Sequence, residues 1–296
     1  MAYEWCAARA ASHYENFPTA SNLLLGKNLS RPVAAVYAFS RQADDFADEA
    51  EFAPAENRIK LLDEWEAHLD RALAGDPRHP AFIALADAIE RYRIEPQLFR
   101  DLLSAFRQDV AKSRYETPEE MLDYCTRSAD PVGRIVLRLH GFHSPQLDAM
   151  SDAICTALQL INFWQDVFID IEKDRIYLPR IEREKFGVTE EQIRAGNVDD
   201  NYRALLKQEC ERARALLERG RPLPEFVGGR LALWLRAVWH GGERILSGIE
   251  AAGYDCANHR PTLGGWDKLV IGVRALTSWP RKARLLPPAT QTECPG

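Results

Sequence analysis

Apolar residues recur at intervals of three and four along most of this 296-residue chain, a helical spacing that constrains its fold more than any other feature. Ala, Leu, Glu and Arg are frequent, whereas alternating β-branched runs are scarce and no Asn-Gly or Asp-Gly pair marks a hairpin. The pattern therefore predicts an all-α protein. With hydrophobic residues at 46%, the chain can bury a large core, and we expect one helical domain over residues 1–280.

The expected helices are separated by turn residues, and Pro131 with Gly133 is expected to kink or interrupt one of them. The helices are predicted over residues 32–50, 56–74, 80–92, 96–112, 118–140, 146–172, 189–195, 199–219, 224–251 and 263–278. The proline-rich end, residues 281–296, is expected to form a loose tail.

A polar stripe interrupts the apolar helix expected over residues 32–50. Tyr37, Arg41, Asp44 and Asp48 stand at offsets of four, seven and eleven, so they share one helix face. The residues around them are mostly apolar, which indicates a largely buried helix. The stripe is therefore expected to face a polar cavity rather than bulk water.

A second stripe with almost the same offsets lies in the helix expected over residues 146–172 and comprises Gln159, Asn162, Asp166 and Asp170. Two aspartate pairs facing one cavity would repel each other unless a cation lay between them. Mg²⁺ prefers oxygen ligands and is commonly shared between carboxylates and substrate phosphates. The two stripes together predict Mg²⁺ and a diphosphate substrate whose departure leaves a carbocation.

Aromatic faces stabilise positive charge, so aromatic side chains are candidates for the lining of such a cavity, although each is also a candidate for the core. The candidates are Phe17, Tyr37, Phe39, Tyr124, Phe163, Phe168, Trp234 and Trp239.

These motifs resemble those of the squalene and phytoene synthases, the head-to-head trans-prenyltransferases, over nearly the whole chain. Residues 37–48 resemble the first aspartate motif of the family, and residues 159–179 resemble the second. Residues 124–133 are similar to its Tyr-Cys segment, and residues 17–21 match its N-terminal substrate segment more loosely. The resemblance implies a helical isoprenoid synthase fold around a central cavity and a reaction that depends on Mg²⁺.

The stripes and the resemblance together assign roles to individual residues. Metal binding is expected of Asp44, Asp45, Asp48, Asp166 and Asp170. Catalytic roles, in orienting the leaving group or placing water, are expected of Tyr37, Arg41, Tyr124, Gln159, Asn162 and Gln165. Substrate binding is expected of Phe17, Ser21, Arg41, Arg175 and Tyr177.

Within the family the resemblance is strongest to the bacterial hydroxysqualene synthases, judged from residues 13–21, 106–109 and 162–166. It implies a lyase that converts presqualene diphosphate and water to hydroxysqualene and diphosphate in squalene and hopanoid biosynthesis. A neighbouring enzyme would supply the presqualene diphosphate, and a separate reductase would complete the route. Gln165 and Ile169 favour this activity, because condensing members usually carry an Arg and an extra acid at these places.

Two alternatives remain open. The chain could be a condensing enzyme that joins two prenyl diphosphates to form presqualene diphosphate, squalene or phytoene. It could also be a non-catalytic helical protein that binds lipid or a partner through Trp234 and Trp239, with both stripes as solvated helix faces.

Charge and cysteine content exclude other classes. The net charge of -6 arises from 38 basic and 44 acidic residues that are intermixed, which argues against a nucleic acid partner. The six cysteines form no CxxC pair, and no GxGxxG segment indicates a nicotinamide cofactor. No stretch approaches the roughly 20 apolar residues of a membrane span. We expect a cytoplasmic protein. Peripheral contact of the C-terminal helices with the inner face of the membrane is left open.

Overall fold

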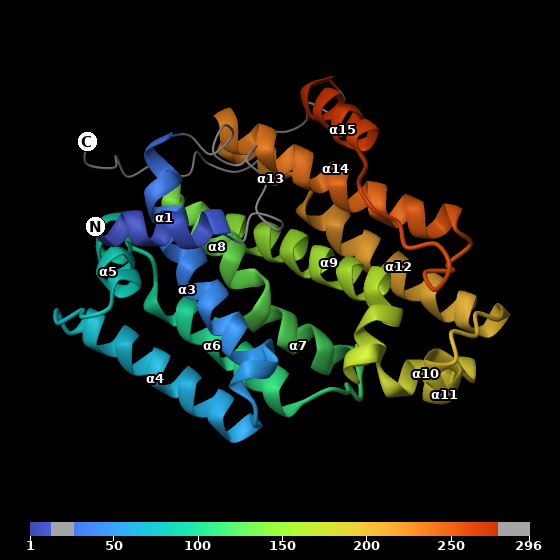
Figure 1. Ribbon diagram of the computed structural model, residues 1–296. Helices are drawn as coiled ribbons and strands as arrows, with labels where there is room; N and C mark the ends of the chain where they lie inside the picture. Colours follow the sequence, from blue (N-terminus) through green and yellow to red (C-terminus); the bar gives the residue numbers. More distant parts are fainter. Residues whose placement is uncertain (13–26, 278–296) are drawn as a thin grey trace. The chain divides into compact units, whose positions relative to one another are not determined.

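The computed structural model describes residues 1–12 and 27–277, and its regular secondary structure over these ranges is helical (Figure 1). A single parallel bridge between Arg114 and Ile176 is the exception. The all-α prediction is therefore confirmed for the described residues. The helices are α1 (Ala2–Ser12), η1 (Lys27–Leu29), α3 (Ser30–Asp48), η2 (Ala50–Phe52), α4 (Ala55–Leu73), α5 (Pro80–Tyr92), α6 (Pro96–Ala111), α7 (Pro118–Ser128), α8 (Asp130–Leu139), α9 (Pro145–Asp170), η3 (Ile171–Lys173), α10 (Arg180–Phe186), α11 (Glu190–Arg194), α12 (Asp200–Gly220), α13 (Leu223–Val227), α14 (Gly229–Ala251) and α15 (Gly265–Thr277).

One expected interruption is confirmed, and one predicted helix is wrong as a continuous element. The helix expected over residues 118–140 is divided into α7 and α8 at Ala129, beside Pro131, where a kink or interruption was expected. The helix expected over 224–251 is divided into α13 and α14 at Gly228, whose φ of 67° lies in the left-handed region that favours glycine. The tail expected over 281–296 lies outside the described residues.

The backbone contacts group the described residues into two compact units. Unit 1 contains residues 1–111 and 131–144, and unit 2 contains residues 112–130 and 145–287, each only where described. The single domain over residues 1–280 stays a prediction.

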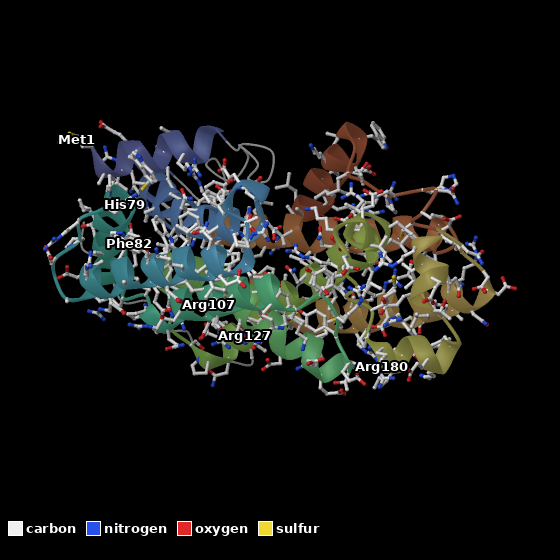
Figure 2. The ribbon with its side chains drawn as sticks, turned by 60° about the horizontal axis from the view of Figure 1, so that its bottom comes forward. Met1, His79, Phe82, Arg107, Arg127 and Arg180 are labelled. Atoms are coloured by element: carbon white, nitrogen blue, oxygen red, sulfur yellow. The ribbon has the colours of Figure 1, made fainter. Side chains whose placement is uncertain are left out.

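In unit 1, helix α3 packs against α1, α4, α5 and α6. Five alanines, at positions 34, 35, 38, 43 and 47, are buried on α3 and let its neighbours approach closely. Phe39 is fully buried, and its ring contacts those of Trp65, Phe82 and Phe99 at centroid distances of 6.2, 5.8 and 5.3 Å. His79 joins the same cluster 6.0 Å from Phe82 (Figure 2). This core fixes the helix that carries the first stripe.

In unit 2, helix α9 packs against α7, α12 and α14. Glycines on two of these neighbours, Gly220 on α12 and Gly242 on α14, lie directly against side chains of α9. A Cβ at Gly242 would approach Leu158 to 2.9 Å, so the close packing of α14 on α9 depends on the missing side chain. The helix that carries the second stripe is thus enclosed by close helix packing.

Candidate functional site

The first stripe lies on α3 as predicted, and its charged residues form a short ion-pair chain. Arg41 lies 3.0 Å from the Asp44 carboxylate and 2.8 Å from that of Asp45. The Asp44 side chain is 41% exposed, so it remains open to a ligand on its outer side. Tyr37, one turn before Arg41, is half-buried, and this burial raises the pKa of its phenol.

Asp45 is in a different environment from its two neighbours in the motif. It is buried, and its second oxygen lies 2.7 Å from the guanidinium of Arg9 on α1. Arg9 also donates to Gln42 at 3.1 Å. Asp45 thus bridges two arginines, and one of them is a residue that the motif did not predict. Asp48, in contrast, is the exposed last residue of α3.

The second stripe lies on one continuous helix, α9. Asp166 accepts a hydrogen bond of 2.6 Å from Nε of Arg260, a residue of the loop between α14 and α15. That hydrogen bond raises the pKa of Arg260 above its usual value, so the guanidinium stays charged. The Asp166 side chain is 15% exposed, and its negative charge is balanced by an arginine 94 residues away in the sequence.

The neighbouring residue Gln165 is engaged with the same loop. Its Nε2 donates to the backbone carbonyl of Pro261 at 2.5 Å. Two consecutive residues of α9 therefore hold two consecutive residues of the loop. Gln159 is half-buried, Asn162 is exposed, and Ile169 is 42% exposed on the outer side of the helix.

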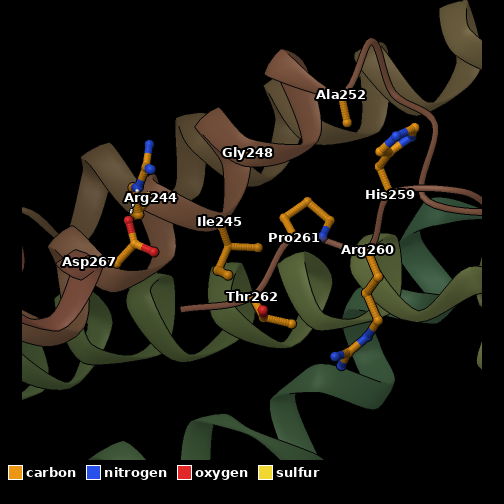
Figure 3. Close-up of a pocket in the computed structure, with 9 residues that line it drawn as sticks. All are labelled: Arg244, Ile245, Gly248, Ala252, His259, Arg260, Pro261, Thr262 and Asp267. Atoms are coloured by element: carbon orange, nitrogen blue, oxygen red, sulfur yellow. Dashed lines mark hydrogen bonds and ion pairs between the residues drawn. The ribbon is translucent and has the colours of Figure 1, made fainter. Parts of the chain in front are cut away.

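A cavity of about 350 Å³ lies between this loop and α14 (Figure 3). Its lining includes the basic residues Arg244, His259 and Arg260. At one end Arg244 is paired with Asp267 at 2.6 Å (Figure 3). Both arginines of the lining are thus paired with acids, and Arg260 links the cavity to the second stripe.

Four aromatic rings of unit 2 form a cluster, and one of them, Phe163, lies on the helix that carries the second stripe. Phe163 on α9 stacks on Tyr177, with centroids 3.6 Å apart and planes at 7°. Tyr115 contacts both Tyr177 and Tyr124 at 5.7 Å, and Tyr124 lies 6.3 Å from Phe163. Tyr115, Tyr124 and Phe163 are buried, while Tyr177 is half-buried. The sequence analysis named three members of this cluster, Tyr124, Phe163 and Tyr177, but missed Tyr115.

Backbone pairing holds the cluster in place. The amide of Ile176 donates to Ser113 at 2.9 Å, and the amide of Arg180 donates to Tyr115 at 2.9 Å. Two short segments that are distant in the sequence therefore run side by side and carry Tyr115 and Tyr177. Arg175 is half-buried, and its amide donates to the carbonyl of Asp170 at 2.9 Å.

The acidic side chains fit Mg²⁺ only where substrate phosphates and water supply the other ligands of the ion. Within residues 1–12 and 27–277, no group of three or more His, Cys, Asp or Glu side chains converges on one point as a metal centre built by the protein alone would require. Each stripe instead supplies two carboxylates one helical turn apart. Mg²⁺ is typically bound by one or two carboxylates together with substrate phosphates and water, so each pair suits the ion in that role.

The remaining sequence candidates have mixed locations. Phe17 and Ser21 lie outside the described residues. Phe39 belongs to the core of unit 1, and buried Trp239 donates to the Leu217 carbonyl at 2.9 Å, so both are packing residues. Phe168 contacts Tyr202, with centroids 5.5 Å apart.

Comparison with known proteins identifies relatives along most of the chain. The family model of squalene/phytoene synthase matches residues 10–267. Hydroxysqualene synthase of Sinorhizobium fredii is 35% identical over 271 residues, which cover 90% of this chain and 90% of that protein. The 15-cis-phytoene synthase of Synechocystis sp. is 34% identical over 277 residues, which cover 88% of this chain and 80% of that protein.

Solved structures show the same fold. Squalene synthase HpnC from Alicyclobacillus acidocaldarius superposes with a TM-score of 0.82 at 41% identity, covering 86% of this chain and 95% of that one. A dehydrosqualene synthase superposes with a TM-score of 0.83 at 22% identity, covering 94% and 96%. At that lower identity the likeness concerns the fold alone.

Proposed function

We propose that this chain, which belongs to the squalene/phytoene synthase family, converts presqualene diphosphate and water to hydroxysqualene and diphosphate. The family consists of isoprenoid synthases, so the chain is an enzyme and the non-catalytic alternative is set aside. The relative named hydroxysqualene synthase, at 35% identity, supports the finer assignment.

The observation that carries the proposal is the low charge of the second stripe. At the two places where a condensing enzyme is expected to carry an Arg and a further acid, this chain has Gln165 and Ile169. The amide of Gln165 is committed to the Pro261 carbonyl, and Ile169 is an exposed apolar residue. A stripe with only Asp166 and Asp170 as acids is suited to one diphosphate rather than two.

The reaction breaks one carbon–oxygen bond and forms another. The diphosphate leaves with the bonding electron pair and gives a cyclopropylcarbinyl cation. This cation rearranges, and a carbon–carbon bond of its three-membered ring breaks as a double bond forms. The oxygen of a water molecule attacks the cation, and that water loses a proton. No oxidant or reductant is needed, which matches the absence of a nicotinamide requirement expected from the sequence.

The aspartates of both stripes serve this reaction in the proposal. Asp44 with Asp48, and Asp166 with Asp170, would hold Mg²⁺, which when bound neutralises the charge that builds up on the leaving diphosphate. Asp45 is assigned a positioning role, because Arg9 and Arg41 already balance its charge. Arg41 is thereby held in place to bind the diphosphate.

Other residues bind the substrate and exclude water. Arg175 would bind the diphosphate, and Tyr37 and Tyr124 would donate hydrogen bonds to it. Tyr177, stacked on Phe163, would present an aromatic face to the carbocation. Gln159 and Asn162 would position the attacking water. Phe17 and Ser21 remain proposed substrate contacts.

The proposed setting of the reaction follows from its substrate and product. An enzyme that forms presqualene diphosphate must act before this one, and a reductase must act on its product. We assign the reaction to the cytoplasm. In the described residues, no helix has the length and apolar character to cross a membrane.

A condensing activity is the second candidate, and the relatives named phytoene synthase favour it. Such an enzyme would join two prenyl diphosphates and release diphosphate at each ionisation. The first stripe is complete, with Asp44, Asp45 and Asp48 all present, and is compatible with this chemistry.

Product analysis separates the two activities. Purified protein with Mg²⁺ receives presqualene diphosphate in one tube and farnesyl diphosphate in another, without reductant. The proposal predicts hydroxysqualene from the first tube and no new product from the second. Asp44→Asn and Asp166→Asn should each lower kcat by about a hundredfold or more, because a carboxylate that stabilises the leaving charge is lost.

Asp101 on α6 provides the control. It is half-buried and lies outside both stripes, so Asp101→Asn should leave kcat unchanged. Presqualene diphosphate, squalene or phytoene appearing in the farnesyl diphosphate tube would favour the condensing activity instead. If the Asp44 variant retained full activity in either tube, the metal assignment would be wrong.

A further inference from the structure

Helix α15 carries apolar residues on two opposite faces. Ile271 and Ala275 are buried. Helix α15 packs against α14 (Figure 1). On the other side lie four large side chains with high exposed fractions: Trp266 at 74%, Leu269 at 58%, Val273 at 51% and Leu276 at 69%. At helical pitch these four fall within an arc of about 80°. They form one continuous apolar face.

This face differs from the other exposed apolar residues of the described chain. Five of these are each between 37% and 44% exposed and lie on five different helices, and Met1, ahead of α1, is fully exposed. The five are Leu73, Ile83, Val132, Ile169 and Ile181. Single exposed apolar residues are ordinary, whereas a contiguous apolar face on a helix marks an interaction site. The apolar face of α15 is therefore a candidate interaction surface.

The charges around the face point to a negatively charged surface. Exposed Lys268 and Arg274 lie on α15 itself, and the sequence that follows contains Arg281, Lys282 and Arg284. The one acid on the helix, Asp267, is engaged with Arg244 at 2.6 Å. This segment is thus strongly basic within a chain whose net charge is -6.

The size of the face distinguishes a lipid bilayer from a protein partner. A stable protein interface buries roughly 800 Å² on each side, which is more than four side chains of one helix supply. A short amphipathic helix with Trp and Leu on one face and basic residues beside them binds in the headgroup region of a membrane. Anionic lipids add to the attraction of the basic residues.

We propose that α15 docks this chain onto an anionic lipid bilayer. Trp266, Leu269, Val273 and Leu276 enter the boundary between headgroups and acyl chains. Lys268 and Arg274 lie among the headgroups. The proposal does not depend on the reaction that the enzyme catalyses, because vesicle binding requires no substrate.

Vesicle flotation tests the proposal with the full chain. Vesicles of equal parts phosphatidylcholine and phosphatidylglycerol should carry the protein upwards, and vesicles of phosphatidylcholine alone should carry far less. The double variant Trp266→Ser, Leu269→Gln should bind at least about tenfold more weakly, since most of the inserted apolar area is lost. Lys268→Gln and Arg274→Gln should each weaken binding about fivefold.

Ile83→Gln removes an exposed apolar residue from α5 and should leave flotation unchanged. Melting curves from circular dichroism identify any variant that fails to fold. Leu276→Gln alone should give an independent, smaller loss of vesicle binding. The proposal is overturned if the wild-type chain does not float with the anionic vesicles, or if the double variant floats equally well. Light scattering that shows a dimer lost in the double variant, without flotation of the wild type, would assign the face to a second copy of the chain.

Discussion

At the scale of single residues, Glu209 is the most unusual acid of unit 2. Its side chain on α12 is fully buried and lies 2.8 Å from Arg212. Burial disfavours the charged form and raises its pKa to about 7, against an ordinary value of 4.5, and the attraction of Arg212 only partly offsets this. The folded chain therefore holds a proton on Glu209 that the unfolded chain has already released.

This difference makes stability depend on pH. Between pH 4.5 and about 7 the folded state binds more protons than the unfolded state, so the free energy of unfolding falls as the pH rises. Glu209→Gln removes the titration, so the variant should gain stability relative to the wild type across this window. Urea unfolding at several pH values measures the difference. Glu211→Gln, at an exposed position of α12, should leave the slope unchanged. If the stability of the wild type did not fall relative to that of the Glu209→Gln variant between pH 4.5 and about 7, titration of Glu209 would not be the cause.

The sequence could predict which site residues share a helix face, because these residues lie on the same helix. The offsets within residues 37–48 and 159–170 correctly indicated one helix face each, because helical pitch alone decides this. The partners of those residues were not predictable. Arg9 lies 36 residues from Asp45, and Arg260 lies 94 residues from Asp166, so neither pair leaves a local pattern.

At the scale of elements, the contact of α12 with α9 depends on Gly220. A Cβ at this position would meet the Met150 carbonyl oxygen at 2.6 Å and would also press on the side chain of Ile154. Gly220→Ala should therefore lower the free energy of unfolding by roughly 1–3 kcal/mol through overpacking. Chemical denaturation midpoints measure the loss.

Gly272 on α15 is the matched control, because a Cβ added there would meet no atom within 4 Å and its φ is not positive. Gly272→Ala should raise stability by roughly 0.5–1 kcal/mol through a smaller loss of backbone entropy. Equal effects of the same sign at the two glycines would show that close packing of α12 on α9 is not the cause.

Element boundaries were predictable where strong local signals exist. Helix α5 begins at Pro80 and ends at Tyr92 as the sequence indicated, since a proline opens it and a periodic apolar pattern runs through it. Helix α1 and the seven-residue α10 were missed, because the short Ala-rich and charged segments that form them have little apolar periodicity. Their positions depend on tertiary contacts, of α1 with α3 and α5 and of α10 with α12.

At the scale of the whole molecule, the helical class and the family were predictable, and the substrate was not. The spacing of apolar residues indicates the helical class. The resemblance of residues 37–48, 124–133 and 159–179 to known motifs indicates the squalene/phytoene synthase family, which the family model confirms. Relatives with different names, phytoene synthase and hydroxysqualene synthase, match the chain at similar identities. The difference between them therefore has to be sought in single positions such as Gln165 and Ile169, and finally in the product.

The most direct test of the proposed reaction follows the oxygen atom of water. The enzyme is given presqualene diphosphate and Mg²⁺ in water labelled with heavy oxygen, and the product is analysed by mass spectrometry. The account predicts hydroxysqualene that carries one labelled oxygen, because water attacks the carbocation after the diphosphate has left. A hydrocarbon product without oxygen, or an alcohol whose oxygen is unlabelled, would contradict it.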